Sequence, residues 1–313
     1  MASQAEGKEA MPPYNECNSI ADVTDFSMEL DLTDLTDELY QKAKEELGET
    51  PEIRADSLVK LRDMIRDKAD IACQLDDDFL LRFLRARRFH TERSYKLLEN
   101  YVNFKASRPD IHENVWPQRL KFLGDEDVIS VPPYKDQHGR RMIIYKVGNW
   151  STSKYKIVEL FKASVVVMEL GIMEKATTVL GGVCIFDLGG VGLSHVWNIT
   201  PAVAETIIDM LVKCFPMRIH AIHIVFQPMV CQMMFAIFKP MLDKRMQDRI
   251  FFHGSDMASL HEHISPKRLP KKYGGIHENF NYRLWIDNLE RNPKVMKALQ
   301  QLGYQLEEGT RLD

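Results

Sequence analysis

The most distinctive hydrophobic pattern in the chain lies between residues 215 and 242, and it divides into two elements. Residues 218–226 carry β-branched and apolar side chains between two prolines, which predicts a short, largely buried strand. From 229 to 239 the spacing becomes helical, yet the only polar residues are Gln232 and Lys239. A helix that is apolar on nearly every side needs apolar surroundings. We therefore expect it to be buried or to cover something hydrophobic.

Two interpretations of this helix stay open. At 1.5 Å per residue it spans only roughly 15–20 Å, too short to cross a bilayer. It is either a core helix of an α/β domain or a gate over a lipid cavity, with an outer face that can touch a membrane. The flexible thioether of methionine favours a gate, because it repacks easily around changing partners. The predicted gate residues are Met229, Val230, Met233, Met234, Phe235, Ile237 and Phe238.

Helical periodicity dominates residues 35–106. Thr36 is the predicted cap of a first helix, and a second helix follows at about 53–68. The third begins at Asp76, where acidic side chains suit the helix dipole, and its sequence FLLRFLRARRF alternates apolar residues with arginines. Thr91 caps a fourth helix. Together these helices predict a small helical module.

After residue 127 the pattern changes to strands alternating with helices. The segments 128–131 and 142–145, joined by the turn DQHGR, begin a sheet. A long helix at 156–174 leads to the continuous apolar run at 183–186, as expected of a strand covered on both faces. A last short strand is predicted at 249–252. The sequence therefore predicts an α/β fold.

Composition and cysteine usage limit the functional classes. The 313 residues are 45% hydrophobic and 27% charged, which is typical of a soluble globular protein. No apolar run is long enough for a transmembrane span and no signal peptide is evident, so we expect a cytoplasmic protein. The five cysteines are scattered, without a C-x-x-C pair. This pattern argues against a disulfide framework and against a zinc site.

Charge is distributed unevenly along the chain. The first 50 residues carry 13 acidic and 3 basic side chains, whereas the remainder carries 32 acidic and 38 basic ones. The basic excess of the body is too small for a nucleic-acid-binding protein, but it is sufficient for a local patch that meets anionic lipids.

Catalytic and cofactor motifs fail when they are tested. Gly190 and Gly192 follow a strand, but the third glycine of a dinucleotide-binding turn is replaced by His195. A phosphatase-like loop starting at Cys214 would need arginine where His220 stands. The chain also lacks a G-x-S-x-G elbow, a Walker lysine and an H-E-x-x-H helix. We therefore expect no catalytic residues, no metal and no cofactor.

Several motifs in a fixed order resemble the CRAL-TRIO (Sec14-like) lipid-carrier family, most closely its branch of tocopherol and retinaldehyde carriers. The resemblance covers roughly residues 35–275. The motifs are FLLRFLRARRF, the DQHGR turn, a strand ending in DLGG, FPMRIHAIHIVFQP, an apolar helix running into KPML, and LPKKYGG.

The resemblance implies a helical N-terminal module packed on an α/β/α domain. A mixed sheet would floor a hydrophobic pocket that is closed by the mobile helical gate. Composition, periodicity and the resemblance together predict four segments: a disordered acidic tail at 1–30, the module at 31–110, the lipid-binding domain at 111–275, and a C-terminal extension at 276–313.

The resemblance further implies two sets of site residues. Arg87, Arg218, His220 and Lys239 match basic residues that bind phosphoinositide headgroups, and His220 replaces an arginine, which makes that contact weaker or pH-dependent. The pocket candidates offer one hydroxyl and no cation, which suits a long hydrocarbon with a single polar end. They are Phe161, Ser164, Val165, Met168, Phe186, Met210, Leu211, Met217 and Met233.

The expected function is that of a non-enzymatic carrier, cytoplasmic and peripheral on membranes. It would bind one hydrophobic lipid and transfer it at phosphoinositide-containing membranes, with no nucleic acid as a partner. The ligand could be a tocopherol, a retinoid, another isoprenoid or sterol-like lipid, or a phospholipid. The alternative is a lipid-sensing scaffold that presents bound lipid to a protein partner.

Overall fold

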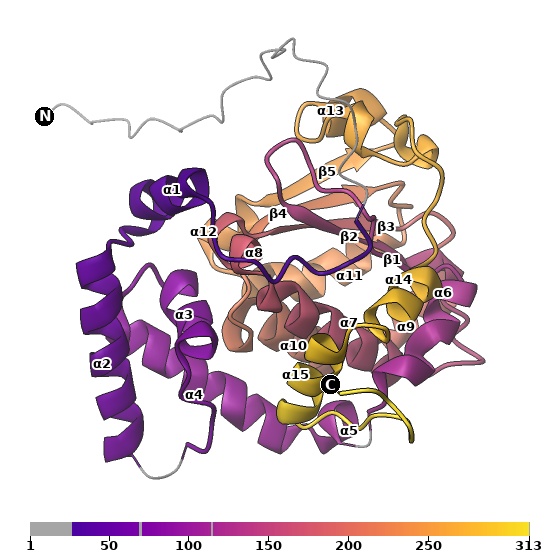
Figure 1. Ribbon diagram of the computed structural model, residues 1–313. Helices are drawn as coiled ribbons and strands as arrows, with labels where there is room; N and C mark the ends of the chain where they lie inside the picture. The colour runs from indigo at the N-terminus through magenta and orange to yellow at the C-terminus, as the bar shows by residue number, and fades with distance from the viewer. Residues whose placement is uncertain (1–26, 69–70, 114, 313) are drawn as a thin grey trace, which may run out of the picture.

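A five-stranded mixed sheet forms the centre of the computed structural model, which describes residues 27–68, 71–113 and 115–312 (Figure 1). The predicted acidic tail lies mostly outside these residues. The strands follow one another in sequence order, with the first pair antiparallel and the others parallel. They are β1 (Ile129–Ser130), β2 (Arg141–Lys146), β3 (Gly182–Asp187), β4 (Ile219–Val225) and β5 (Ile250–Gly254).

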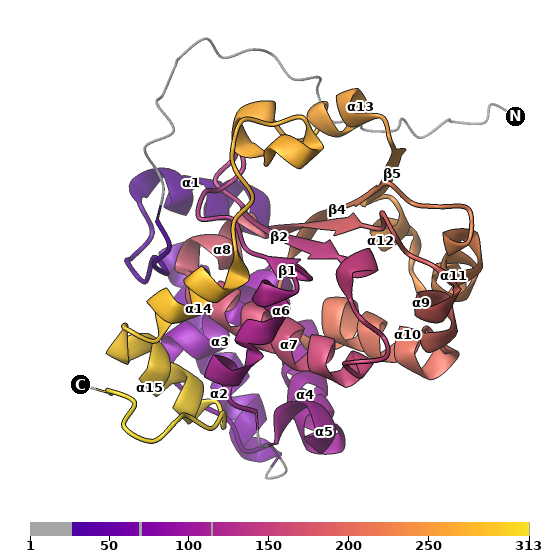
Figure 2. The ribbon, with the colours of Figure 1, turned by 90° about the vertical axis from the view of Figure 1, so that its right-hand side faces the viewer.

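Helical crossovers connect the parallel strands, and helices cover both faces of the sheet. Figure 2 shows α7 and α10 on one side of the sheet and α13 on the other. This α/β/α arrangement confirms the predicted fold class. The crossover helices are α7 (Ile157–Met173), α8 (Lys175–Leu180), α9 (Leu193–Asn198), α10 (Pro201–Ile208), α11 (Cys231–Phe238) and α12 (Lys244–Gln247), and α13 (Met257–His261) follows β5.

Alternation along the strands gives the sheet two different apolar faces. On β3, Val183 and Ile185 pack toward Leu260 of α13, whereas Cys184 packs with residues of α9 and α11. Successive side chains of a strand point to opposite faces, so a continuous apolar run fits a strand covered on both sides. The second face, which carries Cys184, is the one that faces α11.

The N-terminal module consists of four helices on one side of the sheet domain (Figure 1). Thr36 caps its helix as predicted, and Asp76 caps the third helix, since each side chain accepts a hydrogen bond from a backbone N–H three residues ahead. Thr91 does not cap the fourth helix, because it is already its first residue. The helices are α1 (Asp37–Leu47), α2 (Pro51–Asp67), α3 (Asp77–Ala86) and α4 (Thr91–Ser107).

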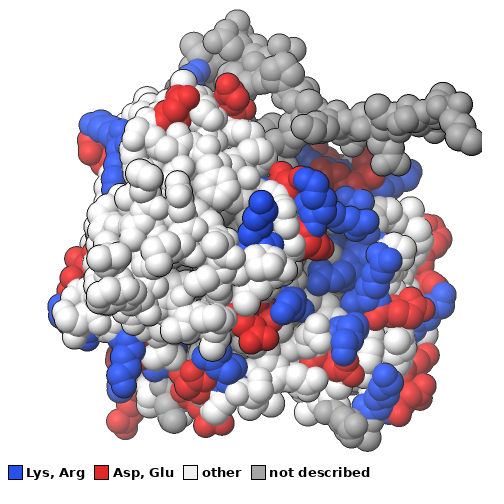
Figure 3. All heavy atoms as spheres, turned by 180° about the vertical axis from the view of Figure 1, so that it is seen from behind, with Lys and Arg blue, Asp and Glu red and all other residues white. Residues whose placement is uncertain are grey.

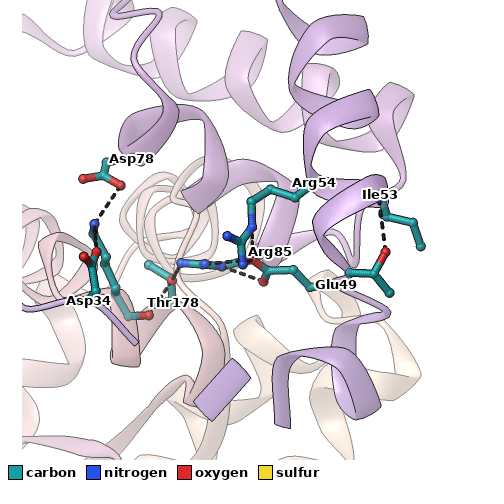
Figure 4. Close-up of polar contacts among 9 residues, drawn as sticks. Asp34, Glu49, Ile53, Arg54, Asp78, Arg85 and Thr178 are labelled. Carbon is teal, nitrogen blue, oxygen red and sulfur yellow. Dashed lines mark hydrogen bonds and ion pairs between the residues drawn. The ribbon is translucent and has the colours of Figure 1, made fainter. Parts of the chain in front are cut away.

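A buried polar network within this module reaches the sheet domain through Thr178 (Figure 4). Arg85 of α3 donates two hydrogen bonds of 2.9 Å to the carboxylate of Glu49, and a third of 3.0 Å to the hydroxyl of Thr178 on α8. Arg54 donates to the same carboxylate at 2.9 Å. Every charge in this buried network has a partner, as burial of ionised groups requires. The network fixes α3 against α8.

The C-terminal extension is more structured than its sequence pattern indicates. The predicted extension at 276–313 forms two helices, α14 (Tyr282–Leu289) and α15 (Pro293–Gln301). Tyr282 and Trp285 are buried in the main core cluster. The shorter helices α5 (Pro109–His112) and α6 (Phe122–Asp125) complete the helical part of the fold, and α6 packs against α14.

Replacing Arg85 by methionine tests the buried junction. Arg85→Met leaves Glu49 with Arg54 alone, and we expect the free energy of unfolding to fall by about 3 kcal/mol. Urea denaturation measures this change. Lys60→Met is the matched control, because its ion pair with Asp56 is solvent-exposed and should contribute little. Equal stability of Arg85→Met and Lys60→Met would contradict the role given to the junction.

Candidate functional site

An apolar cavity of about 50 Å³ lies between the sheet and α7. Its wall includes Ile143, Met168, Cys184, Leu211, Met217 and Ile219. Pockets that hold a drug-sized ligand measure roughly 300–1,000 Å³. A lipid therefore fits here only when the surrounding side chains and helices move apart.

The structure brings some of the predicted pocket residues to this cavity. Met168, Leu211 and Met217 line it directly. Phe186 stacks on Tyr145, another lining residue, with ring centroids 5.0 Å apart. Three of the remaining candidates are packed into the adjoining core: Phe161, Val165 and Met210.

Two predicted pocket residues are placed differently. Met233 lies on the exposed side of α11, so in this conformation it faces away from the cavity. Ser164 is buried, but its hydroxyl donates to the backbone carbonyl of Leu160, one turn earlier, at 2.8 Å. This bond occupies the only hydroxyl proton that the predicted set offers to a ligand.

Sequence reasoning missed two charged residues at the cavity wall, Arg141 and Glu174. They form an ion pair, with Arg141 Nη2 2.6 Å from Glu174 Oε1 and Arg141 Nε 2.9 Å from Oε2. Burial opposes ionisation of Glu174, but the hydrogen bond and charge of Arg141 outweigh it and lower the pKa of the carboxyl group. The guanidinium is thus already paired with a carboxylate.

Tyr145 is another residue of the cavity wall that sequence reasoning missed. Alternation along β2 could have revealed Tyr145, since it shares a face with Ile143.

Helix α11 is buried on one side and exposed on the other. Cys231 and Met234 are buried in the cluster that contains Cys184, whereas Met233 is 59% exposed and Met229, just before the helix, is 81% exposed. This is not the environment of a core helix, which would be covered on all sides. Of the two interpretations of this segment, the structure favours a cover with an apolar outer surface.

The exposed apolar surface of α11 continues onto α9, which packs beside it. Figure 3, which views the molecule from behind, shows a broad surface without charged groups on the side where Figure 2 places α9, α10 and α11. We call this surface the apolar face. Exposed apolar patches of this kind mark sites of interaction. Its large exposed side chains are Leu193, Trp197, Met229 and Met233.

A basic cluster lies beside the apolar face (Figure 3). It consists of Arg88 after α3, Arg218 before β4, Arg245 on α12 and Arg249 before β5. Burial, together with repulsion from Arg88 and Arg249, lowers the pKa of Arg218 even though Glu46 lies 3.4 Å away. Burial and the charges of Arg88 and Arg245 lower the pKa of Arg249 as well. Cations that repel one another in this way favour a bound anion.

The structure brings only part of the predicted headgroup set into this cluster. His220 lies near Arg249, but burial and neighbouring arginines lower its pKa to about 4, so it is neutral at pH 7. Arg87 is also partly buried, and the charge that acts on it is Arg93. Arg88, Arg245 and Arg249 come from separate elements, so no local pattern in the sequence could have identified them as a cluster.

Lys239 lies at the end of the gate helix, next to the basic cluster. Gln247 of α12 donates to the backbone carbonyl of Lys239 at 3.2 Å, and α12 also carries Arg245. The Lys239 side chain is exposed and follows α11 directly. The gate and the basic cluster are therefore neighbours in space.

Metal chemistry and membrane spanning find no support in the described part of the chain. No group of three or more His, Cys, Asp or Glu side chains there is arranged to hold a metal ion. None of the described helices combines the length and apolar character needed to cross a bilayer. Cys17 lies outside the described residues, and the four described cysteines are free thiols.

Comparison with known proteins agrees with this architecture. A sequence model of the CRAL/TRIO domain matches residues 125–275, and one of the CRAL/TRIO N-terminal domain matches residues 36–100. The chain belongs to the CRAL/TRIO family of lipid-binding and lipid-transfer proteins. The matched ranges fall within the predicted module (31–110) and lipid-binding domain (111–275), whose exact boundaries stay predictions.

Relatives of this CRAL/TRIO protein include two human proteins. The human alpha-tocopherol transfer protein-like protein is 38% identical over 252 residues, which are 80% of this chain and 74% of that one. Human clavesin-2 is 30% identical over 258 residues, which cover 82% and 79% of the two chains. The crystal structure of Sfh5 covers 68% of this chain and 77% of that one, with 17% identity and a TM-score of 0.46.

The hydrogen bond of Ser164 to its own helix generates a prediction for this CRAL/TRIO pocket. We expect Ser164→Ala to change the affinity for a fluorescent tocopherol analogue by no more than about twofold, because the hydroxyl is used within the helix. Fluorescence titration measures the dissociation constant. Met168→Ser, which places a polar group on the cavity wall itself, should weaken binding more than Ser164→Ala. The opposite order would show that Ser164 bonds the ligand.

Proposed function

We propose that this protein is a lipid carrier that buries one hydrophobic ligand beside the sheet and exchanges it at phosphoinositide-containing membranes. The observation that supports this proposal best is the apolar face of α9 and α11 lying beside the basic cluster. A membrane interface offers partners for both surfaces at once. Apolar side chains enter the boundary between headgroups and acyl chains, while arginines meet anionic headgroups.

The contacts of α11 suit a gate. Within the described chain, no side chain of α11 makes a hydrogen bond or an ion pair, and the helix is held by apolar contacts such as Phe235 on Phe252, with centroids 4.7 Å apart. Apolar contacts can be exchanged for acyl chains at low cost, whereas directional polar bonds would be lost. Pro228 and Pro240 flank the helix and interrupt its backbone hydrogen bonding.

Opening at the membrane is consistent with the energy of ligand burial. Burying about 400 Å² of apolar ligand surface at about 25 cal/mol per Å² contributes on the order of 10 kcal/mol before ordering costs. A ligand held this strongly leaves slowly in water. A bilayer supplies an apolar environment for the ligand and for the inner side of α11 at the moment the cavity opens.

The character of the cavity favours an isoprenoid with one small polar end, such as a tocopherol or a retinoid. The cation at the wall, Arg141, is already paired with Glu174. A phospholipid would need a free cation or a set of backbone donors for its phosphate. The name of the human alpha-tocopherol transfer protein-like relative points in the same direction. We propose no catalytic activity.

Charge reversal in the basic cluster tests membrane recruitment. Each arginine near an anionic surface contributes about 1 kcal/mol, so Arg218→Glu and Arg249→Glu should each lower binding to phosphoinositide-containing vesicles by about fivefold or more. Co-sedimentation measures the bound fraction. Lys267→Glu, at an exposed lysine after α13 on the other side of the sheet, should leave binding unchanged. Unaltered binding of both arginine variants would exclude the cluster as the docking site and favour a protein partner.

Placing a charge on the apolar face tests the gate. Met233→Asp should slow ligand transfer between vesicles by about tenfold while leaving the melting temperature nearly unchanged, because Met233 is exposed in the closed protein. Transfer is followed by energy transfer from the fluorescent ligand to a vesicle dye. Leu284→Asp is the matched control, since Leu284 is similarly exposed at 53% but lies on α14. Loss of stability in parallel with transfer would instead indicate a structural role for Met233.

A further inference from the structure

Two residues of the cavity wall come from parts of the chain outside both matched family domains. Leu30 precedes the N-terminal domain, and Trp285 follows the CRAL/TRIO domain on α14. Both side chains are buried, with 8% and 4% exposure, and both belong to the main core cluster. The family domains alone therefore do not complete this cavity.

Residues 27–31 form an extended segment that we call the strap. Hydrogen bonds of its backbone groups hold Leu30 in place. The backbone N–H of Ser27 donates to the carbonyl of Pro133 at 3.0 Å, and that of Asp31 donates to Glu174 Oε1 at 2.9 Å. Arg141 Nη2 donates to the carbonyl of Glu29 at 3.1 Å. The strap is thus anchored on both sides of Leu30, through the same Arg141–Glu174 ion pair that borders the cavity.

Helix α14 is anchored equally firmly, which fixes Trp285. Arg283 forms an ion pair of 2.8 Å with Asp125 of α6, and Asp287 forms one of 2.8 Å with Lys121. Just before the helix, the hydroxyl of Ser130 on β1 donates to the carbonyl of Phe280 at 2.6 Å. Trp285 is therefore a rigid part of the wall rather than a side chain on a loose extension.

These two residues lie away from the gate. Cys184 and Ile219 line the cavity and also belong to the cluster that packs under α11, whereas Leu30 and Trp285 belong only to the main core cluster. Leu211 packs against both clusters and lines the cavity between them. The cavity thus has one side under the movable helix and another side closed by anchored segments.

We infer that Leu30 and Trp285 form the closed end of the lipid pocket and set the maximum length of the ligand. This inference rests on the proposed carrier function and adds the residues that select among isoprenoids. A ligand that enters at the gate reaches the far end with its leading terminus. Because both side chains are fixed and buried, a longer chain meets atoms that cannot move away without breaking the anchors.

Affinities for a series of isoprenols test this inference. Geraniol, farnesol, geranylgeraniol and geranylfarnesol differ by one isoprene unit each, and their dissociation constants follow from competition with a fluorescent tocopherol analogue. Leu30→Ala and Trp285→Leu should shift the preferred alcohol to a longer one and change the ratio of long-chain to short-chain affinity by about tenfold. Leu30→Phe should shift the preference toward a shorter alcohol.

Leu58→Ala is the matched control, because Leu58 is buried in α2 and does not line the cavity. It should lose stability without any change in length preference. If Trp285→Leu does not fold, the test of the inference rests on Leu30→Ala and Leu30→Phe, because both substitutions retain the backbone hydrogen bonds of the strap.

The outcomes separate this inference from the proposed function. An unchanged length preference in variants that still bind isoprenols, or an equal shift in Leu58→Ala, overturns the inference and leaves the carrier function intact. If the wild-type protein binds neither the tocopherol analogue nor any isoprenol, the proposed function fails and the inference fails with it.

Discussion

The rest of this structure depends on the need to cover the apolar face of the sheet that carries Cys184, Ile222 and Ile224. A parallel sheet buries both faces, because its crossover helices return over them. Helices α7 and α10 cover this face in part, and α11 completes the cover. The inner side of α11 must be apolar to pack there, and its outer side, with Met233 and with Met229 just before the helix, is largely apolar as well. A cover with two apolar sides can be stable in water when closed and at a membrane when open.

The kinds of interaction are distributed unevenly, because polar bonds fix the frame whereas apolar contacts hold α11. Buried or half-buried ion pairs fix the frame: Arg85 with Glu49 at the module junction, Arg141 with Glu174 beside the cavity, and Lys146 with Asp127 at 2.7 Å near the end of β2. Breaking any of these leaves a buried charge without its partner, which is costly. Helix α11 carries no such bond among the described contacts. Motion is therefore cheapest where the apolar face lies.

The two extensions outside the family domains take part in the same architecture. The strap that carries Leu30 ends on Glu174, and Glu174 is fixed by Arg141 at the start of β2. Helix α14 is tied to α6 and β1, so Trp285 closes the wall near the antiparallel edge of the sheet. Sequence changes in these extensions can alter the pocket without disturbing the common core.

Local patterns in the sequence determined the secondary structure and the family. The helix caps Thr36 and Asp76, the apolar run of β3 and the apolar character of α11 all depend on a few neighbouring residues, so they could be read from the chain. The set of charges that gathers beside α11 could not be read from the sequence. Arg88, Arg218 and Arg249 come from three separate elements, and only packing brings them together, while burial removes the charge of His220. Leu30 and Trp285 are about 250 residues apart and share one cavity wall because long-range contacts anchor the strap and α14. Periodicity shows which side of an element is apolar, but only the tertiary structure decides what that side meets.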